Sequence, residues 1–66
     1  MSVVKVIEIL AESKDGFEAA TKVAVKEAAK TVKNIKSVYV KDMQAIVEGE
    51  EIVNYRVNVK VSFKVD

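Results

Sequence analysis

The C-terminal part of the chain alternates strictly between apolar and polar residues. Between Val53 and Val65 every odd-numbered residue is apolar, and every even-numbered residue between them is polar. Successive side chains of a β-strand point to opposite faces, so this pattern predicts one long strand with a dry face and a wet face. At about 3.4 Å per residue the strand would extend over roughly 45 Å. We expect this length to exceed what a short chain covers alone, so that part of the strand pairs with another copy.

Two more strands are predicted from apolar, β-branched segments. Residues 3–10 are apolar on both faces, which is typical of a strand that is covered on both sides. Residues 36–47 also carry apolar side chains on both faces for part of their length. Gly49 lies in the acidic segment 48–51 and can adopt positive φ, so we expect the last two strands to form an antiparallel hairpin.

A helix is predicted between the first two strands, over residues 15–33. Asp15 followed by Glu18 is a relative of the capping box, so Asp15 is the expected N-cap, with Ser13 as the competing cap. Asn34 can take the left-handed conformation that ends a helix. The expected buried stripe consists of residues at three- or four-residue spacing: Phe17, Ala20, Ala24, Ala28 and Thr31.

The element order is therefore βαββ, an α+β fold in which a three-stranded antiparallel sheet packs around one helix. We expect residues 1–66 to form a single domain. A chain of 66 residues has a small core, and it contains neither the cysteines of disulfides nor the histidines common in zinc sites. Half of its residues are hydrophobic, so oligomerisation is the expected source of added stability.

The charge balance bears on possible partners. Lysine and arginine number 11 against 10 acidic residues, which argues against nucleic acid or an anionic membrane as the main partner. No apolar run approaches the length of a membrane span, and the charged N-terminal segment does not fit a signal peptide. We therefore expect a cytoplasmic protein whose main macromolecular partner is itself.

Four segments together resemble the dodecin family, whose members are small βαββ proteins that assemble as hollow shells of twelve subunits. The matching segments span nearly the whole chain in the same order and spacing: residues 3–9, 31–35, 40–42 and 55–63. The resemblance implies a hollow homododecamer that binds or stores a small ligand without converting it.

Flavin-binding dodecins stack the flavin ring on a tryptophan of the second strand and hydrogen-bond it through a glutamine of the third. Those positions correspond to Ser37 and Arg56 in this chain. Serine has no π-face for stacking, and arginine has no acceptor for a flavin N–H, although it can clamp a phosphate or carboxylate. Tyr39 lies on the same predicted face as Ser37. The expected cofactor-binding residues are therefore Ser37, Tyr39 and Arg56, with flavin binding weakened.

A calcium-binding subgroup of dodecins is more similar, since it also lacks the tryptophan and carries an aromatic–Arg pair, as in Tyr55–Arg56. Calcium prefers several oxygen ligands. Asp42 shares its parity with apolar neighbours, where a carboxylate needs a partner, and Glu48 and Glu50 lie in the hairpin turn. The expected metal ligands are Asp42, Glu48 and Glu50, contributed by neighbouring subunits, with calcium preferred as cargo.

Two other function classes follow from the same residues. A purely structural self-assembling module would need no ligand, and in that case Asp42 and Arg56 would form ordinary ion pairs. An enzyme is the least expected class, because the chain has no histidine or cysteine and no glycine-rich phosphate loop.

Overall fold

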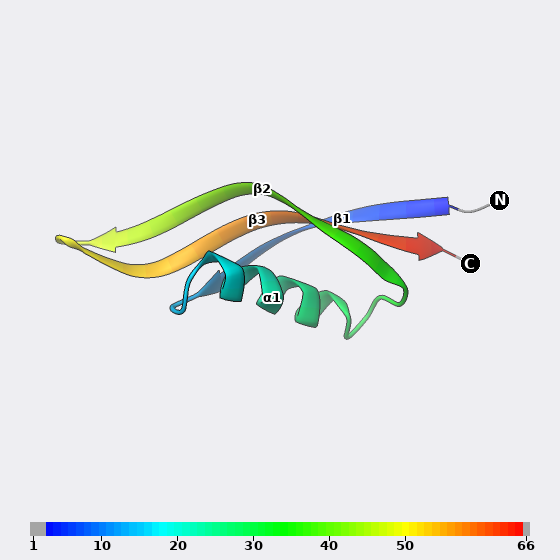
Figure 1. Cartoon of the computed structure of the whole chain (residues 1–66), viewed down its shortest axis with the longest axis horizontal. Coiled ribbons are helices and arrows are strands. Elements are labelled where there is room, and N and C mark those ends of the chain that lie inside the picture. Colours follow the sequence, from blue (N-terminus) through cyan, green and yellow to red (C-terminus); the bar gives the residue numbers. More distant parts are fainter. Residues whose placement is uncertain (1–2, 66) are drawn as a thin grey trace.

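The computed structural model describes residues 3–65 and shows one helix against a three-stranded antiparallel sheet (Figure 1). The elements follow in the order βαββ, and the strands lie in the order β1-β3-β2. Their bounds are β1 Val3–Ser13, α1 Phe17–Ala28, β2 Ile35–Glu48 and β3 Glu51–Val65. The predicted fold and the hairpin of the last two strands are confirmed, and each strand is longer than the pattern indicated.

The central strand β3 is paired on both sides within the subunit. Strand β1 pairs with it from Val65 to Tyr55, and β2 pairs with it from Phe63 to Glu51. The expectation that part of β3 must pair with another copy is therefore wrong. The other two strands run to 11 and 14 residues, so this small molecule extends over 52 Å and covers its own long strand.

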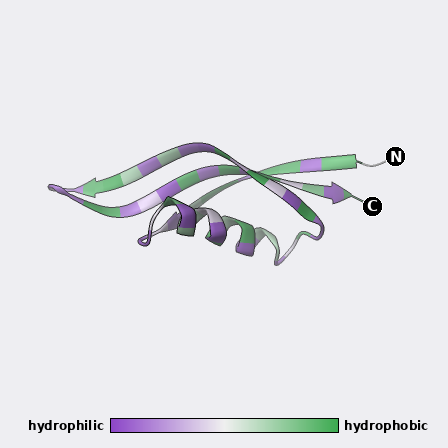
Figure 2. Ribbon diagram, viewed as in Figure 1, coloured by the Kyte–Doolittle hydropathy of each residue, from purple (hydrophilic) through white to green (hydrophobic). Residues whose placement is uncertain are grey.

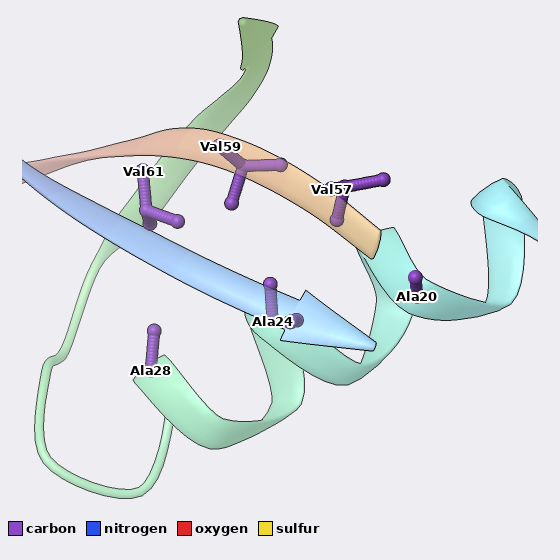
Figure 3. Close-up of a cluster of buried hydrophobic side chains, with 7 residues drawn as sticks. Ala20, Ala24, Ala28, Val57, Val59 and Val61 are labelled. Carbon is purple, nitrogen blue, oxygen red and sulfur yellow. The ribbon is translucent and has the colours of Figure 1, made fainter. Parts of the chain in front are cut away.

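The core consists of small residues from the helix packed against valines of β3 (Figure 3). Ala20 and Ala24 are fully buried, and Ala28 is almost so. Their Cβ atoms lie opposite Val57, Val59 and Val61, which are also fully buried (Figure 3). Alanine lets the helix backbone approach the sheet closely, so branched residues of the central strand fill the space between them.

The helix is shorter than predicted and begins differently. It starts after Gly16, which takes φ 122° and has no side-chain cap, so the Asp15 cap and its reciprocal Glu18 are wrong. The hydroxyl of Ser13 accepts the Asp15 N–H at 3.0 Å instead, which makes a local turn, and Glu18 forms an ion pair with Lys22. The left-handed backbone at Gly16 favours glycine and explains why the start is set there.

The helix ends at Ala28, five residues before the predicted end at residue 33. The Ala28 carbonyl accepts the N–H groups of both Thr31 and Val32, which tightens the chain into turns. Thr31 therefore lies outside the helix and is exposed, although it was predicted in the buried stripe. Asn34 has φ 63° as predicted, and its carbonyl accepts the Lys64 N–H at 3.0 Å, which leads the chain into β2.

The sheet has one face under the helix and one face without a helix, which we call the open face. Even-numbered residues of β3 from Asn54 to Lys64 lie on the open face, opposite in parity to the buried valines. Apolar residues also recur along all strands (Figure 2). Several on the open face are more than half exposed: Val4, Val6, Leu10, Tyr39, Val47 and Ile52. Only one side of β1 is covered within the subunit, so the expected cover on both sides is not found within a single subunit.

Candidate functional site

Three residues predicted to contact a cofactor lie on the open face. Ser37 is opposite Ser62 on β3, and their hydroxyl groups are hydrogen-bonded to each other. Tyr39 is opposite Lys60 and is 66% exposed, so its ring has no cover within the subunit. Arg56 lies on the same face of β3. The shared face of Ser37 and Tyr39 is confirmed.

These three residues do not form one site within a subunit. Ser37 is level with Ser62, which is six positions from Arg56 along β3. Six residues of an antiparallel strand span roughly 20 Å. A ligand that contacts Ser37 and Arg56 together would therefore have to take them from different subunits.

Asp42 lies in polar surroundings rather than among apolar neighbours. A bulge between Val40 and Asp42 shifts the register, so Val40 is opposite Val59 on the helix side, whereas Asp42 is opposite Asn58 on the open face. The parity argument for an apolar environment of Asp42 is therefore wrong, because one extra residue in a strand moves all later side chains to the other face.

The three predicted metal ligands are also separated within the subunit. Glu48 is paired with Glu51 at the hairpin end, and Glu50 lies in the turn between them. Asp42 is six residues from Glu48 along β2, which corresponds to roughly 20 Å. Among residues 3–65, no three acidic side chains are close enough to hold one ion. A site with these carboxylates would have to combine copies from several subunits.

Arg56 forms an ion pair, as expected for a purely structural module, but its partner and the polar cluster around it were not predicted from the sequence. The Arg56 Nε donates to Glu12 Oε2 at 2.6 Å, and the Asn54 Nδ2 donates to Glu12 Oε1 at 2.9 Å. Glu12 is directly opposite Arg56 across the β1–β3 ladder. The register of β1 against β3 identifies this pair, and the sequence pattern alone did not predict that register.

Packing between the helix and β3 holds the part of β3 next to Arg56 in place. Tyr55 points to the helix side and meets Phe17 edge to face, with ring centroids 5.1 Å apart. The Asn54 Oδ1 accepts the Tyr55 N–H at 3.0 Å, so both ends of the Asn54 amide are bound. Phe17 and Tyr55 therefore act as packing residues and hold the strand that carries Arg56.

A second polar cluster crosses all three strands around Glu8. The Lys41 Nζ, at the bulge of β2, lies 3.6 Å from Glu8 Oε2 on β1, with Asn58 of β3 between the two strands. A hydrogen bond from the Asn58 side chain lowers the pKa of the Glu8 carboxyl, and the positive charges of Lys41 and Lys60 lower it further. Lys41 is the extra residue of the β2 bulge, and its side chain reaches across the central strand to Glu8.

Glu8 gives the stability a measurable pH dependence. Since its folded-state pKa lies below the ordinary 4.5, the ionised carboxylate stabilises the fold above that pH, and this contribution is lost as the pH falls through the lowered value. The urea midpoint of the native protein is expected to exceed that of Glu8→Gln at neutral pH, and the gap is expected to close as the pH falls below 4.5. A gap that stays constant with pH would show that the charge of Glu8 is not involved.

Comparison with known proteins places the chain in a family. A sequence profile described as Dodecin matches residues 3–66. The chain belongs to the dodecin family. Dodecins form dodecamers and bind flavins. A comparison with curated proteins found no match.

Solved dodecin structures agree with this fold over its full length. A point variant of the Thermus thermophilus dodecin is 27% identical, with a TM-score of 0.94, and the match covers 100% of this chain and 98% of that one. A second Thermus thermophilus structure gives the same identity and TM-score and is covered to 97%. The Streptomyces coelicolor dodecin, at 23% identity, has a TM-score of 0.93 over 98% of this chain and 93% of its own, which supports the fold alone.

The sequence analysis also predicted that the chain has no membrane-spanning segment. Among residues 3–65, the single helix α1 has 12 residues and is neither long nor apolar enough to cross a membrane.

Proposed function

We propose that this dodecin forms a hollow dodecamer that binds and stores a small ligand without converting it. The observation that carries the proposal is the exposed apolar surface of the single subunit. Leu10 is 67% exposed on the open face, and Met43 is 60% exposed on the helix side. Monomeric proteins rarely expose contiguous apolar patches, so this surface supports association through both faces of the sheet.

The ligand is proposed to bind between subunits. Sites for small molecules are concave and bury most of the ligand. The surface formed by residues 3–65 has no pocket of this kind. The residues expected to contact a ligand are exposed on the open face or at the hairpin end, where neighbouring subunits of a shell can close a site around them.

The assembly is tested by mass. Sedimentation equilibrium is expected to give about twelve times the 7.3 kDa of one chain. A stable folded monomer at micromolar concentration would contradict the proposal. The absorbance and metal content of the same preparation then identify its cargo. A flavin spectrum supports flavin storage, stoichiometric calcium supports metal storage, and neither supports a purely structural shell.

Calcium is the cargo we propose first, with Asp42 as the leading ligand and Glu48 and Glu50 as the next. Asp42 is an exposed carboxylate on the open face, and carboxylate oxygens are ligands of the kind that calcium prefers. Symmetry-related copies of such carboxylates would repel one another, and a shared divalent ion would relieve that repulsion.

Calcium is therefore expected to raise the melting temperature of the shell, because it binds the folded assembly and not the unfolded chain. Sodium chloride at equal ionic strength is the control and should give no such rise. Asp42→Asn should remove the calcium-dependent rise and leave the mass of the shell unchanged. An undiminished response in Asp42→Asn would exclude this residue as a ligand.

Flavin is the second candidate, supported by the family and by the shared face of Ser37 and Tyr39. We expect riboflavin to bind weakly, with little quenching of its fluorescence, because Ser37 offers no ring for stacking. Ser37→Trp combined with Arg56→Gln should tighten riboflavin binding by at least the ~1 to 3 kcal/mol that one base stacked on an aromatic ring contributes. Fluorescence titration measures this change. Tight, quenched binding by the native protein would show that Tyr39 is sufficient.

A further inference from the structure

Glu12 holds Arg56 in one orientation on the open face. Its Oε2 accepts the Arg56 Nε–H at 2.6 Å, and its Oε1 accepts the Asn54 amide at 2.9 Å. Both oxygens of the carboxylate are therefore engaged, and the Asn54 amide is itself fixed by the Tyr55 N–H. A long arginine side chain ordinarily loses conformational freedom when it binds a ligand, and here the contact with Glu12 has already restricted it.

The outer edge of the Arg56 guanidinium is available for another partner. Within residues 3–65 the contact with Glu12 uses Nε, and the two terminal amino groups form no further hydrogen bond or ion pair. The Arg56 side chain is 39% exposed, so these donors reach the surface of the open face. Gln44 is opposite Arg56 on β2 and adds an amide at the same level of the sheet.

We propose that Arg56, positioned by Glu12, binds an oxyanion of the shell's ligand, with a phosphate monoester as the preferred group. The two terminal amino groups of arginine match two oxygens of a phosphate or carboxylate in a planar, bidentate contact. Glu12 offsets the charge of Arg56, so the oxyanion is recognised by the direction of the donors more than by net charge. This site rests on the proposed binding function and is distinct from the carboxylates proposed for calcium.

Flavin mononucleotide and riboflavin test the proposal, because they share one ring system and differ by a phosphate monoester. Isothermal titration of the assembled native protein is expected to show flavin mononucleotide binding roughly tenfold or more tightly than riboflavin, as for a hydrogen bond to a charged group. Arg56→Gln should bring the two affinities together. Arg56→Lys, which keeps the charge and removes the planar fork, should lose most of the difference.

Glu12→Gln distinguishes positioning from a merely structural role. It should reduce the preference for flavin mononucleotide while the riboflavin affinity and the mass of the shell stay as in the native protein. Lys22→Gln is the matched control, since it breaks the exposed ion pair with Glu18 on the helix and should leave the preference intact.

Inorganic phosphate provides a probe that does not depend on flavin binding. If neither flavin binds, phosphorus NMR titration should still show phosphate binding by the native shell and its loss in Arg56→Gln. Equal affinity for the two flavins, a preference retained in Arg56→Gln, or absence of both flavin and phosphate binding would overturn the proposal. Sedimentation of the same samples separates these outcomes from a failure of the shell to form.

Discussion

Val59→Asp is expected to abolish both folding and assembly. Val59 is fully buried between Ile9 of β1 and Val40 of β2, on the side covered by the helix. A carboxylate at this position would have no charged partner, and an uncompensated buried charge destabilises a protein by about 4 kcal/mol or more. A domain of this size has little stability beyond that amount. Circular dichroism should show an unfolded chain, and sedimentation should show no shell.

The control places the same residue on the surface. Lys22 lies on the exposed side of the helix, with 78% of its side chain accessible. Lys22→Asp should therefore fold and assemble, with at most a small loss from the broken ion pair to Glu18. If Val59→Asp gave a folded shell like Lys22→Asp, Val59 would not be a core residue, and the position of the helix over β3 would be wrong.

Ala24→Leu is expected to weaken the packing of the helix on the sheet and to destabilise the fold. Ala24 has no exposed surface, and its Cβ faces the valines of β3 (Figure 3). The added carbon atoms have no space to enter, and overpacking of this kind typically destabilises a fold by about 1 to 3 kcal/mol. The urea midpoint should fall accordingly, while the helical signal of any folded fraction remains.

Ala29→Leu provides the comparison for this substitution. Ala29 is exposed and caps the C-terminal end of the same helix with ordinary helical dihedral angles. It receives the same added atoms without displacing any neighbour, so its midpoint should stay close to that of the native protein. Equal losses for the two variants would show that helix packing on the sheet is not the cause.

Alternation of apolar and polar residues was sufficient to predict β3, and runs of apolar, β-branched residues were sufficient to predict β1 and β2. In β3 the pattern placed Val57, Val59 and Val61 on the covered face and Arg56 on the other, and the register confirms both. The stripe of Ala20, Ala24 and Ala28 was also found correctly, because the helical period depends only on local geometry. These features are set by residues that are close together in the chain.

The ends of the helix and the environment of Asp42 could not be predicted in this way. The helix begins at Phe17, after the positive φ of Gly16 and the turn in which Ser13 binds the Asp15 N–H, and hydrogen bonds to the Ala28 carbonyl close its last turn. The bulge before Asp42 exists only in the pairing of β2 with β3. A bulge has no marker such as a glycine at this position, so parity counted along the sequence gave the wrong face.

The sequence by itself determined the βαββ order and the two faces of the central strand. The tertiary structure alone decided that the long strand is paired within one subunit and that Glu12 meets Arg56 across 44 positions of sequence. The physical reason is that periodicity reports which side of an element is buried, whereas ladder register reports which residues meet. Register is fixed only when the strands close against one another around a common core.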